Sequence, residues 1–149
     1  SNVPYDNYDA LVISDYNKGF LTTDKIVELT ESFDGPVFID TKKNKLPKVD
    51  AFVKINEHEF KNFESTIENL IVTRGGKGCE YKGKLYPAEK VNVFDVVGAG
   101  DTFLSALVFF YLTLGDIDTA LQLANKAASI SVSNFGTYSL TPQDIKTLS

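Results

Sequence analysis

The stretch DVVGAGDTF, residues 95–103, decides how this sequence is interpreted, because an extended run enters it and a long apolar helix leaves it. Gly98 and Gly100 let the backbone turn tightly and bring its N–H groups close to a ligand. The helix that follows adds unsatisfied N–H groups and the positive end of its dipole. Together these features predict an anion site suited to a phosphate group.

Asp101 allows two interpretations of this turn. A carboxylate beside a phosphate repels it, so Asp101 needs another purpose, and accepting a proton from an attacking hydroxyl is the obvious one. Aspartate also caps helices well, and spacing alone does not separate the two roles. The turn is neither a Walker A loop nor the GxGxxG turn of dinucleotide-binding folds.

Upstream of the turn, short apolar runs alternate with helical patterns. We expect strands at residues 10–14, 37–39, 51–55 and 70–73. A helix over residues 23–33, with Thr22 or Thr23 as N-cap, separates the first two strands, and a short helix follows Asn56. This alternation predicts an α/β fold with a largely parallel sheet flanked by helices.

Downstream of residue 78 the pattern changes. Residues 79–81 and 84–86 flank Gly83 as in a β-hairpin, and residues 91–94 are again extended. Two long helices are expected over about 101–114 and 117–135. No repeat or linker interrupts residues 1–149, so one domain is expected.

Polar side chains stand where the predicted strands end, at Ser14-Asp15, Asp40, Asn56 and Thr73. Ligands of open α/β sheets bind outside the carboxyl ends of the strands, so these side chains are candidates for a common crevice.

Composition excludes several classes of protein. The net charge of −5 argues against nucleic-acid binding, which needs clustered Lys and Arg. Cys79 is the only cysteine, so no disulfide forms within the chain, and His58, the only histidine, stands between two glutamates as a solvated helix residue would. Residues 103–114 are too short and mixed to span a bilayer, and residues 1–9 lack a signal pattern. A cytoplasmic protein with no membrane partner is expected.

The octapeptide VVGAGDTF, residues 96–103, resembles the signature of the ribokinase-like (PfkB-type) carbohydrate kinases. Further segments follow in that family's order: residues 14–19, Asp40 with Lys42, and residues 56–59, 72–75, 123–128 and 136–137. SDYNKG, VTR and FGT are most similar to the heptose-7-phosphate kinase half of bacterial bifunctional ADP-heptose synthases. The resemblance implies a ribokinase-like fold whose N-terminal half and lid are missing, with residues 1–149 as its C-terminal, ATP-binding and catalytic part.

The same resemblance assigns the chemistry. It implies that Asp101 is the catalytic base and that backbone N–H groups of Gly98, Ala99, Gly100 and Asp101 form the anion hole for the transferring phosphoryl group. ATP and a sugar or sugar phosphate are the implied ligands, with heptose 7-phosphate as one candidate.

The resemblance also implies metal sites. Asn56 and Glu59 match the N-x-x-E pair with which the family organises Mg²⁺, largely through water. The same two residues could equally be an Asn cap followed by a first-turn Glu. Asp95 resembles part of a monovalent-cation (K⁺) site, with backbone near Val97 and Gly136, although the family often has Thr where this chain has Val97.

Thr73, Gly75 and Gly78 match the family's T-x-G-x-x-G nucleotide loop, although a glycine-rich hairpin connection has the same composition. Asn125 aligns with a position near the adenine, or is a polar residue tucked against a neighbouring backbone. Four charged residues match cleft-facing positions of the heptose-kinase subfamily: Asp15, Lys18, Asp40 and Lys42. Of these, Lys42 is expected to bind the nucleotide.

An ATP-dependent sugar kinase is the leading interpretation, with a nucleoside kinase of the same superfamily close to it. A non-catalytic nucleotide-binding or interaction module is the alternative of another class. A response-regulator-like domain could use Asp15 and Lys77, but the GAGD turn has no place in it. The isolated 149 residues are expected to have no kinase activity. A homodimer, and a nucleotidyltransferase domain fused to the kinase part in the parent protein, are two further expectations.

Overall fold

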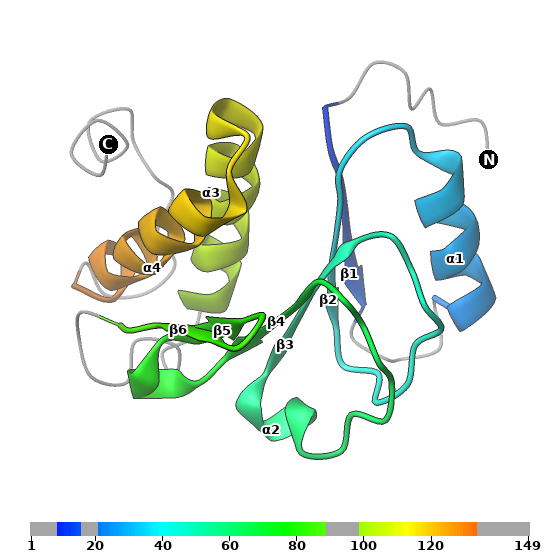
Figure 1. Ribbon diagram of the computed structural model, residues 1–149, viewed down its shortest axis with the longest axis horizontal. Helices are drawn as coiled ribbons and strands as arrows, with labels where there is room; N and C mark the ends of the chain where they lie inside the picture. The colour runs from blue at the N-terminus through cyan, green and yellow to red at the C-terminus, as the bar shows by residue number, and fades with distance from the viewer. Residues whose placement is uncertain (1–8, 16–20, 89–98, 134–149) are drawn as a thin grey trace. The chain divides into compact units, whose positions relative to one another are not determined.

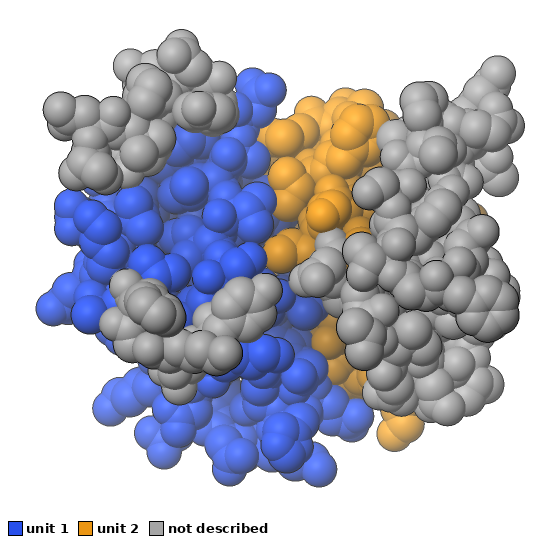
Figure 2. All heavy atoms as spheres, turned by 180° about the vertical axis from the view of Figure 1, so that it is seen from behind, with its two compact units in different colours: residues 1–72 blue, residues 73–149 orange. Residues whose placement is uncertain are grey.

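The computed structural model describes residues 9–15, 21–88 and 99–133 (Figure 1). The chain divides into two compact units, residues 1–72 and residues 73–149, which are coloured separately in Figure 2. Each unit has its own packing and is described separately, and the expectation of one domain over residues 1–149 stays a prediction.

Unit 1 is built on parallel strands. β1 (Leu11–Asp15) pairs with β2 (Val37–Thr41), β2 pairs with β3 (Phe52–Asn56), and β4 (Leu70–Thr73) follows β3 in the sheet order. The backbone N–H of Val53 donates to the Asn69 carbonyl, 2.9 Å away, at the point where β4 begins. All four strands lie within a residue or two of their predicted positions.

Two helices accompany these strands. α1 (Thr23–Ser32) begins after Thr22, whose Oγ1 accepts a hydrogen bond of 3.1 Å from the Lys25 N–H. Thr22, the first of the two expected caps, is therefore the N-cap. α2 (Glu57–Phe60) is the predicted short helix after β3.

Strand alternation divides the side chains of unit 1 between two faces. Ile13, Ile39, Val53 and Ile55 join one buried cluster with Ile26 of α1. The opposite face has Phe38 and Phe52, whose rings stack at 5.2 Å. Because successive residues of a strand point to opposite faces, the polar residues at the strand ends are divided in the same way.

Unit 2 contains a hairpin and two long helices. The 3₁₀ turn η2 (Gly75–Lys77) leads into β5 (Cys79–Tyr81), which pairs antiparallel with β6 (Lys84–Tyr86). Lys82 and Gly83 both have positive φ, as a two-residue hairpin turn requires. The predicted hairpin is confirmed.

α3 (Ala99–Leu114) and α4 (Ile117–Ser133) pack against each other. Gly115, with φ of 70°, ends α3, and its N–H donates to the Tyr111 carbonyl at 2.8 Å. Both helices begin and end within two residues of their expected bounds. The extended segment expected at residues 91–94 lies outside the described residues. Within the described ranges, no helix has the length and apolarity to cross a bilayer.

Candidate functional site

The carboxyl ends of β1, β2 and β3 meet at one edge of unit 1, because the three strands are parallel. The register places Asp15 opposite Thr41 and Asp40 opposite Lys54. The polar ends of β1 and β2 that the sequence singled out are thus neighbours, and cross-strand pairs decide what each can do.

Asp15 is buried, with 4% of its surface exposed. Its Oδ2 accepts a hydrogen bond from Thr41 Oγ1 at 2.9 Å and lies 3.5 Å from Lys43 Nζ. The Asp15 carbonyl accepts a further bond of 2.9 Å from the Lys42 N–H. Asp15 therefore ties β1 to the segment after β2, and the cleft-facing position expected for it stays a prediction.

Asp40 faces Lys54, a residue that the sequence pattern did not single out. Lys54 Nζ lies 3.6 Å from Asp40 Oδ1, and Lys54 is only 7% exposed. The signal was a lysine inside the apolar strand AFVKIN, two residues before Asn56 and so on the same face of β3. A buried lysine needs an anionic partner, and Asp40 supplies it.

Asn56 and Glu59 form a capping box at the start of α2. Glu59 N–H donates to Asn56 Oδ1 at 2.7 Å, and Asn56 N–H donates to Glu59 Oε1 at 2.8 Å. The second carboxylate oxygen, Oε2, lies 2.8 Å from Lys42 Nζ. The structure thus brings three expected ligand-binding residues together, and it also gives Asn56 and Glu59 the capping role that the sequence left open.

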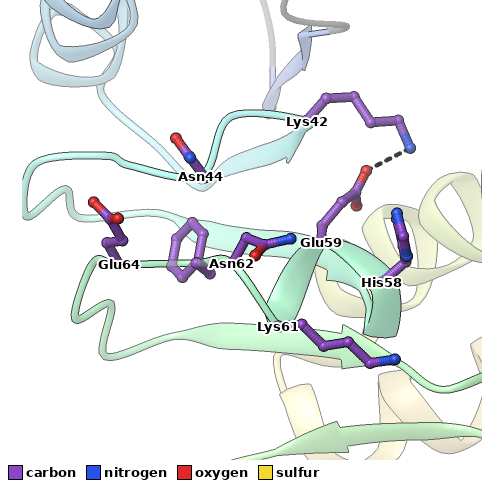
Figure 3. A pocket seen from close by; sticks show the side chains of 8 residues that line it. Lys42, Asn44, His58, Glu59, Lys61, Asn62 and Glu64 are labelled. Carbon is purple, nitrogen blue, oxygen red and sulfur yellow. Dashed lines mark ion pairs between the residues drawn. The ribbon is translucent and has the colours of Figure 1, made fainter.

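A cavity of about 570 Å³ opens beside Glu59 (Figure 3). Its walls come from two loops that are tied together by hydrogen bonds from Glu64 N–H to the Asn44 carbonyl and from Leu46 N–H to Ser65 Oγ. Its lining residues are Lys42, Asn44, His58, Glu59, Lys61, Asn62, Phe63 and Glu64. His58 is exposed, as expected for a solvated helix residue.

The described residues hold no group of three or more carboxylate, imidazole or thiolate ligands that could bind a metal directly. Mg²⁺ needs few protein ligands, because it keeps several of its waters. Glu59 has one oxygen in the capping box and the other beside Lys42. These residues therefore fit a metal ion that is held through water, and they fit direct coordination only if Lys42 moves.

In unit 2, the loop after β4 is closed by its own backbone. Arg74 N–H donates to the Gly78 carbonyl at 2.7 Å, and Gly78 N–H donates to the Gly75 carbonyl at 3.1 Å. Gly75 and Gly78 have positive φ, and Thr73 is buried at the end of β4. A Cβ on Gly78 would lie 2.0 Å from the Tyr86 carbonyl oxygen, so the hairpin itself requires glycine there.

Asn125 is buried on α4, and its Nδ2 donates to the Tyr86 carbonyl at 3.1 Å. This contact is the backbone-tucked arrangement that the sequence allowed. A cavity of about 330 Å³ adjoins it, lined by Lys84, Leu85, Tyr86, Pro87, Gln122, Asn125 and Lys126.

Tyr86 also contacts α4 through its hydroxyl, which donates to Asp118 Oδ1. Lys84 Nζ reaches the same oxygen at 2.9 Å and lies over the Tyr86 ring. Burial, with the Asp118 hydrogen bond second, raises the pKa of Tyr86, while the Tyr86 hydroxyl and then Lys84 lower the pKa of Asp118. Sequence reasoning missed this cluster, because its members lie far apart along the chain.

The anion hole is expected at the start of α3. The helix begins at Ala99, so Gly100 and Asp101 belong to its first turn. Asp95, Gly98 and Lys18 lie outside the described residues. Val97 and Gly136 lie outside them as well.

Comparison with known proteins gave a family match and curated relatives. The model of the pfkB family carbohydrate kinases matches residues 34–144. The bifunctional protein HldE of Campylobacter jejuni subsp. jejuni serotype O:2 is 31% identical over 94% of this chain and 36% of its own length. HldE of Pasteurella multocida is 32% identical over 94% of this chain and 35% of its own length. The chain therefore spans about a third of the length of the curated relatives it matches.

Solved structures with this fold include a ribokinase from Thermotoga maritima, with a TM-score of 0.69, 20% identity, and coverage of 98% of this chain and 59% of that one. Arabidopsis thaliana ribokinase complexed with ribose and ATP has a TM-score of 0.69 and 17% identity, and the match covers 97% of this chain and 56% of that one. Phosphofructokinase-2 from Escherichia coli in complex with potassium has a TM-score of 0.67 and 17% identity, and the match covers 97% of this chain and 58% of that one. At these identities the likeness shows the fold, and the expected ribokinase-like α/β fold is confirmed.

Proposed function

Because the chain belongs to the pfkB family of carbohydrate kinases, we propose that it supplies the nucleotide site and the catalytic base for ATP-dependent phosphorylation of a sugar or sugar-phosphate hydroxyl. The proposed reaction joins the acceptor oxygen to the γ-phosphorus and breaks the bond between that phosphorus and the oxygen bridging to the β-phosphate. ADP is the leaving group.

The observation that carries this proposal is the start of α3 at Ala99, inside the GAGD turn. The first four N–H groups of a helix have no acceptor within it, so they can face the oxygens of a transferring phosphoryl group. Gly98, Ala99 and Gly100 are proposed to offer these groups. Backbone donors held in place stabilise the developing charge at no cost of reorganisation.

Asp101 is proposed to accept the proton of the attacking hydroxyl. It lies in the first turn of α3, next to the proposed phosphoryl site. A base at that point removes the proton as the new O–P bond forms, which makes the acceptor oxygen a better nucleophile.

The nucleotide is proposed to bind along unit 2. Thr73, Gly75 and Gly78 offer a loop with positive-φ glycines at which a phosphate chain can approach the backbone. The mostly apolar cavity beside Asn125 and Tyr86 is proposed for the adenine, since flat bases favour apolar walls with a few polar groups.

Asn56, Glu59 and Lys42 are proposed to serve the Mg²⁺ that accompanies ATP. Bound Mg²⁺ neutralises phosphate charge, and these residues would orient its waters. Asp95 is proposed for a monovalent cation, and the potassium complex of E. coli phosphofructokinase-2 supports that assignment.

Heptose 7-phosphate is the proposed acceptor, supported by the HldE relatives at 31% and 32% identity. We also propose a fused nucleotidyltransferase domain, a homodimer and a cytoplasmic location. A non-catalytic nucleotide-binding or interaction module is the second candidate.

The deciding experiment compares wild-type parent protein with Asp101→Asn, using ATP, Mg²⁺ and a panel of sugars and sugar phosphates. We expect the wild type to phosphorylate at least one acceptor and the variant to be slower by about 10²–10⁴-fold with ADP binding retained. Near-normal turnover by Asp101→Asn would remove that residue from the base role. No turnover by the wild type with any acceptor would favour the binding module.

A further inference from the structure

Glu59 is held in a fixed orientation by the capping box that it forms with Asn56. Its Oε1 accepts the Asn56 N–H at 2.8 Å, and its N–H donates to Asn56 Oδ1 at 2.7 Å. Only 12% of its side chain is exposed. The capping box therefore sets the direction in which the remaining oxygen, Oε2, points, and Figure 3 shows the Glu59 carboxylate facing Lys42.

Lys42, which contacts that oxygen at 2.8 Å, is held much less firmly. Its side chain is 45% exposed, at the end of β2 and on the wall of the cavity. A lysine ammonium sits on a flexible four-carbon stem, and ion pairs at this exposure are weak. The pair thus joins a fixed anion to a cation that can leave.

We propose that Lys42 is a resident counter-ion that competes with a divalent metal ion for Glu59. This inference rests on the proposed role of Glu59 in metal binding. While Lys42 stays, an approaching metal ion meets a positive charge beside the carboxylate and is repelled. Free metal therefore binds weakly, and it binds well when an anion in the cavity draws the ammonium away.

The cavity offers that anion the ammonium group of Lys61 and several polar neighbours. His58 and Lys61 line it with Lys42, and Asn44 and Asn62 add amide groups. An anion entering there can exchange Glu59 as the partner of Lys42. Lys42 would then contact the anion while Glu59 orients the waters of the metal ion.

The test measures binding of Mn²⁺ alone to the purified 149-residue chain, by the loss of the free-ion electron paramagnetic resonance signal at fixed ionic strength. Lys42→Met removes the competing charge. Coulomb's law for a single and a double charge about 6 Å apart in a water-like dielectric predicts a dissociation constant about tenfold lower. Lys42→Arg keeps the charge and is expected to stay within about twofold of the wild type.

Lys61→Met is the matched control, because it removes the same charge from the same cavity. It should change Mn²⁺ affinity much less than Lys42→Met does. The proposed competition would be wrong if both variants raised the Mn²⁺ affinity equally, if Lys42→Met did not raise it, or if no protein bound Mn²⁺ detectably. Glu59→Gln tests the underlying proposal separately: if it binds Mn²⁺ as the wild type does, Glu59 is not part of the metal site, whatever Lys42 does.

Discussion

Two glycines of unit 2, Gly78 and Gly83, both have positive φ but differ in how much space a Cβ would have. Gly78 has φ of 98°, and a Cβ there would lie 2.0 Å from the Tyr86 carbonyl oxygen and 2.6 Å from the Ala88 nitrogen. Both are backbone atoms, so the segment that contains Tyr86 and Ala88 would have to move. We expect Gly78→Ala to destabilise the protein by about 2–4 kcal/mol, measured by urea unfolding.

Gly83 provides the matched control for that substitution. Its φ is 78°, but a Cβ there would meet no atom within 4 Å. Gly83→Ala should therefore cost only the conformational penalty, about 1 kcal/mol. Equal losses from the two variants would show that the close approach at Gly78 does not matter.

At the scale of elements, the β5–β6 hairpin is joined to α4 through Tyr86. The Tyr86 hydroxyl donates to Asp118, and the Tyr86 carbonyl accepts from Asn125 Nδ2 at 3.1 Å. Lys84 adds a bond of 2.9 Å to Asp118. The hairpin also forms one wall of the cavity proposed for the adenine, so this join sets the width of that cavity.

The join should weaken in acid. Hydrogen bonds from Tyr86 and then Lys84 hold the pKa of Asp118 below its usual value. A carboxylate with a lowered pKa stabilises the folded state above its unfolded pKa of about 4, and this contribution is lost as the pH falls through the folded pKa. We expect the thermal midpoint of the wild type to exceed that of Asp118→Asn at pH 7, and the two to converge in acid below about pH 4.

Tyr86→Phe is the companion variant for the acid experiment. Without the hydroxyl, the first cause of the lowered pKa is gone, so Asp118→Asn should shift the midpoint less in the Tyr86→Phe background. The same shift in both backgrounds would mean that Asp118 acts independently of the hairpin.

At the scale of the whole molecule, the residues proposed for nucleotide binding and proton transfer can be compared with what a complete kinase reaction needs. The chain spans 59% of the T. maritima ribokinase and 36% of the C. jejuni HldE. Every residue proposed for ATP, Mg²⁺ and proton transfer belongs to these 149 residues, whereas none is proposed for holding the sugar. Positioning of two reactants can supply roughly 7–11 kcal/mol of a barrier.

We therefore expect a polypeptide of residues 1–149 to bind ADP weakly in the presence of Mg²⁺ and to phosphorylate no sugar. Calorimetry measures the first, and radiolabel transfer from ATP to a sugar panel measures the second. Robust phosphorylation that is lost in Asp101→Asn would show that these residues suffice to position the acceptor.

The sequence by itself determined the family and the kinds and order of the described strands and α-helices. Alternating apolar runs, the Thr22 cap, and the turn at Gly83 act within a few residues, so they can be found without the fold. The GAGD signature likewise lies in one stretch. The Asn56–Glu59 pair was visible by its spacing, but spacing could not separate a cap from a metal site.

Only the tertiary structure decided which charges meet. Asp15 and Thr41 are 26 residues apart, and Tyr86 and Asp118 are 32 residues apart. Their contacts depend on the register of parallel strands and on the packing of a hairpin against a helix, and no local pattern encodes either. Lys42 meets Glu59 for the same reason, because the ends of β2 and β3 lie side by side. The order of elements follows from local preferences, whereas the partner of each charge follows from the folded chain as a whole.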